Sequence, residues 1–242
     1  MNNSDRTLKI DGLVNARDLG GLRRTNGEDT PYGVFYRAEN IDLIAPSGWD
    51  QLRSSGIRTI VDLRQQSERE QDIQQRPNWL TIIHIDLDNI ENEEFWKPYL
   101  KEGLESSSMY YTEHLKEMPE VAAGALELLA TAPEGGVLFH CKSGRDRTGL
   151  IALLLLSAID TKPEEIVDDY LETVRLGEER GKQLGRENPE SELELLLQKH
   201  GTSTEEAFRN AVEILEYSNF LATTRLSQET IQLLKTWRGA VK

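Results

Sequence analysis

A cysteine and an arginine, six positions apart, carry most of the chemistry that this sequence offers. Cys141 and Arg147 stand in the segment HCKSGRDRTG, residues 140–149, between a short apolar stretch and a longer one. The backbone amides of residues 142–147 can point at one centre, and the helix expected to follow adds the positive end of its dipole. We therefore expect this loop to bind a tetrahedral phosphate dianion.

The side chains of the loop have distinct expected roles. The field of the loop favours Cys141 as a thiolate, which is placed for in-line attack on phosphorus. Arg147 can return to the ligand as a planar clamp on two phosphoryl oxygens. Thr148 can donate a hydrogen bond to the thiolate when it departs, and His140 can support the loop through its ring N–H. Gly144 permits the turn and the close approach of backbone to ligand.

Cys141 has a second interpretation, as a small buried hydrophobe. The arginine at the required offset, followed by a threonine and an apolar helix, favours the nucleophile. The nucleotide-binding pattern G-x-x-x-x-G-K-[ST] is absent, which argues against hydrolysis of ATP or GTP.

Lys142 and Arg145 add two cations to the loop, in a chain whose formal net charge is −14. The backbone amides of the loop, including that of Ser143, are expected to bind one phosphate together with Arg147. The extra cations therefore favour a substrate with more than one phosphate. The alternative is local charge balance with Asp146 and the surrounding glutamates.

The composition limits the function classes. With 242 residues the chain fits one large domain. An acidic chain disfavours general nucleic-acid binding and attachment to anionic membranes. A single cysteine excludes an intramolecular disulfide, a four-cysteine zinc site and a C-x-x-C redox pair.

Residues 1–9 are polar and lack the hydrophobic region of a secretory signal, and the longest apolar run, residues 150–156, is too short to span a bilayer. We expect a cytoplasmic protein with no stable membrane insertion. Export by a leaderless route would leave no sequence signal.

Apolar periodicity predicts alternating strands and helices up to Pro163 and helices alone beyond it. This order predicts an α/β fold: a central, mostly parallel twisted sheet flanked by helices, with a helical C-terminal part. The expected strands are 34–37, 57–63, 80–87 and 137–141. The expected helices are 47–55 (capped by Ser47, with Trp49 and Leu52 inward), 110–130, 148–159, 164–176, 205–220 and 227–237. Residues 89–108 suggest a loop or short helices.

Residues 177–192 are rich in charge and glycine, with Leu184 as the one large aliphatic side chain. Such a stretch buries little surface alone. It is either a solvated surface helix or part of a lid over a site.

Several motifs in order resemble the cysteine-dependent protein tyrosine phosphatases. Their signature H-C-x5-R-[ST] is met by residues 140–148. The branch typified by mycobacterial tyrosine phosphatase B carries an N-A-R-D-L-G-G segment, here residues 15–21, and a Tyr/Phe-Arg pair, here residues 36–37. It continues with a strand like residues 56–64 and a glutamate-bearing segment like residues 68–70.

The loop of that branch reads HCxxGKDRTG, so Arg145 stands where lysine is usual and keeps the charge. The resemblance implies a single phosphatase domain over residues 10–242 and a phosphocysteine intermediate. The implied substrates are phosphotyrosine proteins, sometimes phosphoserine or phosphothreonine, and phosphoinositides, without a metal or other cofactor. It also implies a helical lid that would suit residues 177–220. Arg17 and Asp18 would tie their segment to the core, and Arg17 could contact substrate.

The proton donor is missing from its usual place in the wider family, a loop roughly 30 residues before the cysteine, where a carboxylic acid protonates the leaving group. Glu113 and Glu117 fall near that offset, but on an expected helix where exposed glutamates are ordinary. Asp146 and Asp62 match positions that the resembled branch ties to catalysis. We expect Asp146 to donate the proton and Asp62 to support or share the role.

Both aspartates also have a structural interpretation. Asp146 could hold the loop by pairing with Arg145 or another arginine, and Asp62 could bond Arg64 or loop amides.

Two other function classes have less support in the sequence. A silent phosphate-binding module would be expected to lose Cys141, Arg147 or Thr148, and all three are present. A sulfur-transfer or arsenate-reducing thiol relay needs a resolving cysteine, and the sequence has none. The preference between phosphoprotein and phosphoinositide stays open, and no pattern indicates an oligomeric state.

Overall fold

The computed structural model describes residues 6–215 and 217–241. Four expectations fall partly outside these ranges. Residues 1–5 belong to the polar N-terminal segment, position 216 to both the expected lid and the expected helix 205–220, and residue 242 to the end of the expected domain. Within the described residues, no helix is both long enough and apolar enough to cross a membrane.

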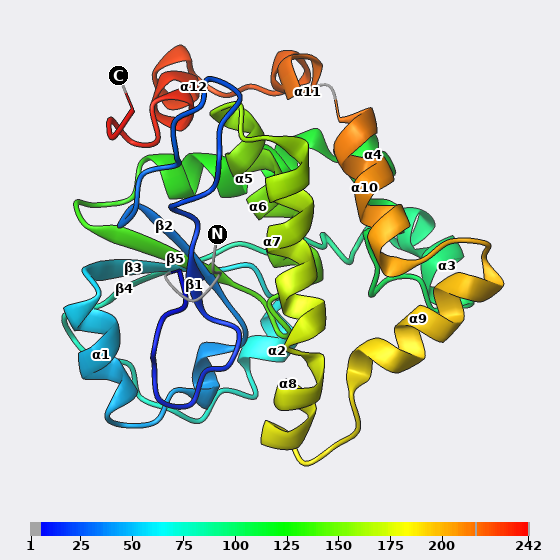
Figure 1. Ribbon diagram of the computed structural model, residues 1–242, viewed down its shortest axis with the longest axis horizontal. Coiled ribbons are helices and arrows are strands. Elements are labelled where there is room, and N and C mark those ends of the chain that lie inside the picture. The colour runs from blue at the N-terminus through cyan, green and yellow to red at the C-terminus, as the bar shows by residue number, and fades with distance from the viewer. Residues whose placement is uncertain (1–5, 216, 242) are drawn as a thin grey trace.

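Five strands form one sheet in the order β1-β2-β5-β3-β4 (Figure 1). The central strand β5 (Gly136–His140) runs parallel to β2 (Phe35–Ala38) on one side and β3 (Ile57–Asp62) on the other. The edge strand β4 (Thr81–His84) is parallel to β3, and the short β1 (Arg17–Asp18) is antiparallel to β2. The sheet is therefore mostly parallel, as the sequence predicts, with β1 as an addition that its two residues did not signal.

The register brings the carboxyl ends of the parallel strands to one edge. His140 pairs with Ala38 on one side and with Asp62 on the other, and Asp62 pairs with His84. In such sheets, ligands bind beyond the carboxyl ends of the strands. The loops that follow these four strands gather at this edge, and the segment containing Cys141 is one of them.

The sheet is buried on both faces because its strands alternate between two apolar clusters. Val137 and Phe139 of β5 join the larger cluster, and Leu138 between them joins the smaller one. Helices α5 (Pro119–Ala130) and α6 (Asp146–Ala158) cover the first face, and α1 (Gly48–Ser54) covers the second. Nearly every residue of α6 is buried, which fixes the helix directly behind the loop.

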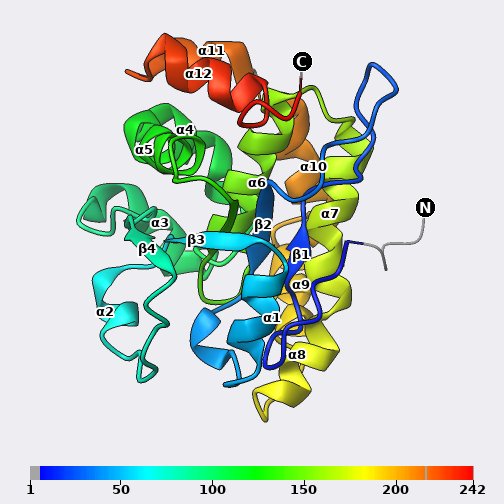
Figure 2. The ribbon, with the colours of Figure 1, turned by 90° about the vertical axis from the view of Figure 1, so that its left-hand side faces the viewer.

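The other helices lie around this centre, with α11 and α12 at one end of the molecule and α8 at the other (Figure 2). Their bounds are α2 (Gln66–Arg69), α3 (Glu93–Glu102), α4 (Tyr111–Glu117), α7 (Pro163–Arg175), α8 (Gly177–Gln183), α9 (Pro189–Lys199), α10 (Thr204–Ile214), α11 (Tyr217–Thr223) and α12 (Gln228–Lys235), with 3-10 turns η2 (Ile41–Leu43) and η3 (Ser108–Tyr110).

Some expected elements differ in extent. The helix expected over 110–130 divides before Pro119, because proline has no N–H to continue the α4 hydrogen bonds and instead begins α5. The helix expected over 205–220 divides because Leu215 has an extended backbone. Ser47 stands at the N-cap of α1, but its hydroxyl donates to Asp11 and caps no amide. The strand expected over 80–87 ends at His84.

Candidate active site

The phosphate loop, residues 141–147, joins the central strand to the buried helix α6. Cys141 follows β5 directly and is 1% exposed. The amides of residues 142–144 donate no hydrogen bond to an acceptor within the described part of the chain. Because α6 begins at Asp146, the amides of its first turn also have no intrahelical partner. These donors can all serve an anion.

The first two carbonyl groups of the loop are tied outward. The Nδ1 atom of His140 lies 3.0 Å from the carbonyl oxygen of Cys141. The amide of Asn40 donates to the carbonyl of Lys142 at 3.1 Å. Burial lowers the pKa of His140 to about 4, so the ring is neutral at pH 7 and Nδ1 carries its hydrogen toward that carbonyl.

The next two carbonyl groups are tied by the N-terminal motif and β2. The side-chain amide of Asn15 donates to the carbonyl of Ser143 at 3.3 Å, and Nη2 of Arg37 donates to the carbonyl of Gly144 at 2.8 Å. In a trans peptide the carbonyl and the following N–H point in opposite directions. Holding the carbonyls outward therefore turns the amides inward before any ligand arrives.

A buried carboxylate on α7 holds the arginines behind the loop. Asp169 accepts ion pairs from Arg6 at 2.9 Å, Arg17 at 2.9 Å and Arg37 at 2.6 Å. Burial alone would raise the pKa of Asp169, but the three guanidinium groups hold it far below its usual value. The carboxylate is therefore charged at any physiological pH, and Arg37 is fixed where it meets the loop.

The structure places Arg17 behind the loop. Its three guanidinium nitrogens bond Asp169, Asn15 and Thr173, and its side chain does not line the cavity described below. Burial lowers the pKa of Arg17 to about 10, so it stays charged at neutral pH. The expected tie to the core is present, whereas a contact of Arg17 with substrate stays a prediction that this placement does not favour.

Arg147 is held between two carboxylates that follow neighbouring strands. Glu68 accepts hydrogen bonds from both Nη1 and Nη2 of Arg147, and the bond from Nη2 to Oε1 is 3.0 Å long. Oδ2 of Asp88 lies 3.1 Å from Nη1. Burial would lower the pKa of Arg147, but the bond to Glu68 and the charges of Cys141 and Asp88 raise it well above its usual value. The guanidinium is therefore charged at any physiological pH.

Asp88 is a site residue that the sequence reasoning missed. Burial raises its pKa although Arg147 and a 2.8 Å hydrogen bond from Gln65 oppose that effect. Glu68 was part of the resemblance but was assigned no role. The sequence does carry a signal for both residues, because each follows a strand whose carboxyl end meets the edge of the sheet where the loop lies.

The carboxylate of Asp62 forms an ion pair with a neighbouring arginine. Arg64 donates through Nε at 2.9 Å and through Nη2 at 2.7 Å. Burial would raise the pKa of Asp62, but the bonds to Arg64 outweigh it and hold the pKa below its usual value. Asp62 does not line the cavity, so its surroundings fit the structural interpretation better than a share in proton donation.

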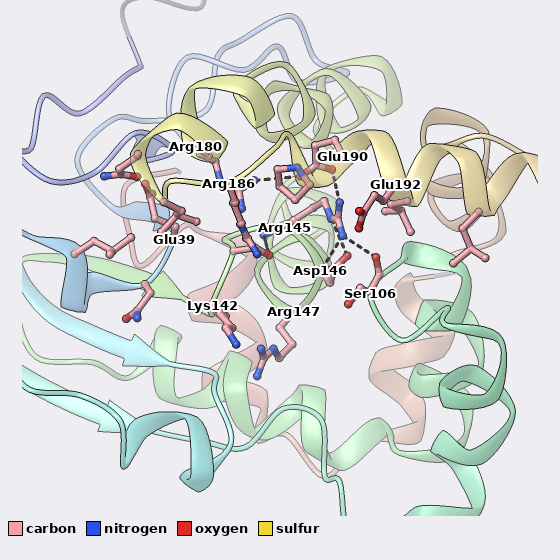
Figure 3. A pocket seen from close by; sticks show the side chains of 18 of the residues that line it. Glu39, Ser106, Lys142, Arg145, Asp146, Arg147, Arg180, Arg186, Glu190 and Glu192 are labelled. Carbon is pink, nitrogen blue, oxygen red and sulfur yellow. Dashed lines mark hydrogen bonds and ion pairs between the residues drawn. The ribbon is translucent and has the colours of Figure 1, made fainter.

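Arg145 and Asp146 face each other at the start of α6. Nε of Arg145 lies 3.1 Å from the carboxylate of Asp146, and Nη2 donates to the carbonyl of Ser106 at 2.7 Å. Nη1 bonds Glu190 of α9 (Figure 3). Arg145 therefore joins the loop to two other segments. Of the two extra cations of the loop, Lys142 is the one that forms no ion pair with a described residue.

A cavity of about 680 Å³ lies over the loop, in the size range of small-ligand sites. Lys142, Ser143 and the three residues 145–147 form its floor, and residues of α8 and α9 form its roof (Figure 3). The segment 177–192 thus lies against the site. Helix α10 does not belong to this roof, because Phe208 is buried in the main cluster.

Thr148 is fully buried, and its hydroxyl has no hydrogen-bond partner among residues 6–215 and 217–241. A buried, unpaired hydroxyl is costly unless something supplies the missing partner. The expected bond to a departing thiolate stays a prediction, and the free hydroxyl is compatible with it.

Comparison with known proteins agrees with this geometry. The sequence profile described as the tyrosine phosphatase family matches residues 8–237. A Cupriavidus necator protein named "Putative tyrosine-protein phosphatase" is 31% identical over 172 residues, which cover 69% of this chain and 62% of that protein.

Two further relatives carry related names. A "Tyrosine-protein phosphatase" of Nostoc commune is 29% identical over 58% of this chain and 48% of its own length. The "Triple specificity protein phosphatase PtpB" of Mycobacterium tuberculosis is 28% identical over 57% of this chain and 60% of its own length. The chain therefore spans less than two thirds of the relatives it matches.

The first prediction concerns the backbone of the loop. Gly144 has a φ of +70°, and an added Cβ would lie 2.7 Å from the carbonyl oxygen of Ala38 and 2.8 Å from Nδ2 of Asn15. Gly144→Ala should lower kcat/KM on an aryl phosphate at least about 100-fold, because the inward amides are displaced. Gly201→Ala is the matched control, with a φ of +73° and open space around the added Cβ. Equal activity of the two variants would contradict the cradle.

The second prediction concerns Asp169, which is 1% exposed. Asp169→Asn leaves three buried arginines without their common partner and should cost about 3–5 kcal/mol in urea unfolding at pH 7. Because the folded pKa is depressed, the loss is full above about pH 4, the ordinary aspartate value, and shrinks only as the pH falls further. Asp168→Asn, in an exposed pair with Arg175, should cost less than about 1 kcal/mol. Similar losses in both variants would refute the role of Asp169.

Proposed function

The chain belongs to the tyrosine phosphatase family, and from that premise we propose that it hydrolyses phosphate monoesters through a phosphocysteine intermediate. The observation that carries this proposal is the set of outward-tied carbonyls between Cys141 and Gly144. They preorganise an amide cradle in the loop that begins with Cys141, the one cysteine of the sequence. Donors fixed in advance lower the energy of a transition state because nothing has to reorganise during the reaction.

The reaction follows from the placement of the side chains. The phosphoryl oxygens enter the cradle and take the guanidinium of Arg147, which Glu68 keeps in orientation. The Cys141 thiolate attacks phosphorus, the bond to the ester oxygen breaks, and a carboxylic acid protonates that oxygen. The carboxylate left by that acid then takes a proton from water, which attacks the phosphocysteine. The sulfur–phosphorus bond breaks, inorganic phosphate leaves, and Thr148 stabilises the departing thiolate by its hydroxyl.

We assign the proton donor to Asp146. The leaving group occupies the cavity, and of the three candidate aspartates only Asp146 lines it. Asp88 contacts Arg147 and lies outside the cavity lining, so it orients the clamp. Asp62 is held as a carboxylate by Arg64, which makes it a poor acid.

The substrate class follows from the family and the cavity. We propose phosphotyrosine as the primary substrate, with phosphoserine and phosphothreonine as secondary ones. A second candidate is a polyphosphorylated small molecule such as a phosphoinositide. It is favoured by Lys142 and Arg186, which line the cavity and form no ion pair with any described residue. A comparison of phosphopeptides with phosphoinositides on the purified protein separates the two.

The third prediction tests the hydrolase itself. The protein should release phosphate from an aryl phosphate, and Cys141→Ser should retain less than about 0.1% of that rate, since the serine hydroxyl is not ionised. Phosphate release is measured by a colorimetric assay, with inorganic phosphate binding to the variant as the control for an intact cradle. A wild-type protein that binds phosphate but hydrolyses no ester would establish the silent binding module instead.

The fourth prediction compares the pH–rate profiles of three Asp→Asn variants. Asp146→Asn should lower kcat by about 100-fold or more and abolish the fall in rate at alkaline pH, where the donor loses its proton. Asp62→Asn and Asp88→Asn should keep that alkaline fall. Because the pKa of Asp88 is raised, an alkaline fall lost in Asp88→Asn and kept in Asp146→Asn would move the donor to Asp88 and overturn the assignment.

A further inference from the structure

A glycine lies near the start of the buried helix α6, at position 149. Glycine weakens a helix interior relative to alanine, so its presence there calls for a contact that only glycine allows. A Cβ added to Gly149 would lie 2.7 Å from the hydroxyl oxygen of Tyr111 and 3.0 Å from two ring carbons of Tyr170. Both tyrosines are buried. The absent side chain therefore leaves a gap in α6 into which two tyrosine side chains fit.

One of the two tyrosine hydroxyls uses this gap to reach the backbone of the phosphate loop. The hydroxyl of Tyr111, the first residue of α4, donates to the carbonyl oxygen of Asp146 at 2.5 Å. Burial raises the pKa of Tyr111 well above its usual value, so the hydroxyl keeps its proton and can donate at any physiological pH. The hydroxyl of Tyr170, against the same glycine, has no hydrogen-bond partner within residues 6–215 and 217–241. Of these two hydroxyls, that of Tyr111 is the one that holds the start of α6.

The ring of Tyr111 is itself held by aromatic neighbours. It meets Phe208 of α10 edge to face, with ring centroids 6.1 Å apart, and Tyr110 in the same manner at 5.1 Å. Phe208 in turn stacks on Tyr170, with centroids 3.9 Å apart. Aromatic pairs in these arrangements stabilise a core beyond the burial of their area. The hydroxyl of Tyr111 is therefore presented to α6 from a fixed position.

Asp146 depends on this bond because few other contacts fix it. It is the first residue of α6, and helices fray at their ends. Among the described residues its carboxylate bonds Arg145 alone, and the same guanidinium also bonds Glu190 and the carbonyl of Ser106. Because the peptide group is planar, fixing the carbonyl oxygen of Asp146 fixes the peptide plane next to its Cα. The bond from Tyr111 thereby sets the direction in which the side chain of Asp146 leaves the backbone.

We propose that Tyr111 is a positioning residue for the proton donor: its hydroxyl, admitted by Gly149, holds the backbone of Asp146 so that the carboxyl group meets the ester oxygen of the substrate. This inference rests on the proposed phosphatase reaction and on the assignment of its acid to Asp146. In that step the bond between phosphorus and the ester oxygen breaks, and the proton of Asp146 moves to that oxygen. Such a transfer needs heavy atoms within hydrogen-bond reach, and a displacement of about 1 Å can cost about 100-fold in rate.

The fifth prediction is a loss of activity that depends on the leaving group. Tyr111→Phe removes the hydroxyl and keeps the ring. With phenyl phosphate, whose basic leaving oxygen needs the proton, kcat/KM should fall about tenfold. With dinitrophenyl phosphate, whose leaving oxygen departs readily as an anion, kcat/KM should stay within about twofold of wild type. A general disturbance of the fold or of the amide cradle lowers both values equally and leaves their ratio unchanged.

Two other tyrosines provide matched controls. Tyr170→Phe removes an unpaired hydroxyl beside the same glycine. Tyr36→Phe removes a hydroxyl that donates to the carbonyl of Ser55 at 2.9 Å, in the apolar cluster on the other face of the sheet. Both variants should leave the ratio of the two kcat/KM values within about twofold of wild type, since neither hydroxyl contacts the donor. Gly149→Ala, which displaces the hydroxyl of Tyr111 without removing it, should lower the ratio in the same direction as Tyr111→Phe.

A double variant connects the effect to the acid. In the Asp146→Asn background, which has no proton to give, Tyr111→Phe should change neither kcat/KM value by more than about twofold. An unchanged rate on phenyl phosphate, an equal loss on both esters, or a further loss in the Asp146→Asn background would each overturn the proposal. A wild-type protein inactive on both esters refutes the proposed function and the positioning role with it, whereas an active wild type with an unaltered ratio in Tyr111→Phe refutes the positioning role alone.

Discussion

The hydrogen bonds that hold the carbonyl groups of the phosphate loop outward are the constraint on which the site depends. Free amides that face one point are costly to bury, and they stay in place only because each carbonyl on the other side of its peptide has a fixed donor. Arg37 provides one such donor, and Asp169 fixes Arg37. The N-terminal motif, β2 and α7 therefore act together as the support of a few backbone amides.

The charges around the loop also affect what the negative net charge of the chain implies for substrate binding. A net charge of −14 describes the whole surface, whereas the site gathers cations whose carboxylate partners are local. Glu68 and Asp88 hold Arg147, and Glu190 with Asp146 holds Arg145. Substrate phosphate can take over Arg147 at short range, where screening by salt is weak. The protein should attract highly charged substrates poorly from a distance and bind them by contact.

The sequence could predict what depends on local pattern: the parallel sheet, the loop between β5 and α6, and the position of Cys141. It could not predict which partner a long charged side chain would choose. Arg17 bonds Asp169 and Arg145 bonds Glu190 of α9, and these carboxylates lie far along the chain and reach the arginines only in the fold. Two helices end earlier than the apolar pattern predicts, after Glu117 and after Ile214. Each ending depends on a single residue within a segment whose apolar spacing otherwise indicates one continuous helix.

A direct test of the central claim is the identification of the phosphoenzyme. The protein is mixed with an aryl phosphate, quenched in acid within one turnover, digested and analysed by mass spectrometry. Covalent catalysis through the preorganised loop predicts one phosphoryl group on the peptide that contains Cys141, present in the Asp146→Asn variant and absent in Cys141→Ser. An active enzyme that carries no phosphoryl group, or carries it on another residue, would contradict the account.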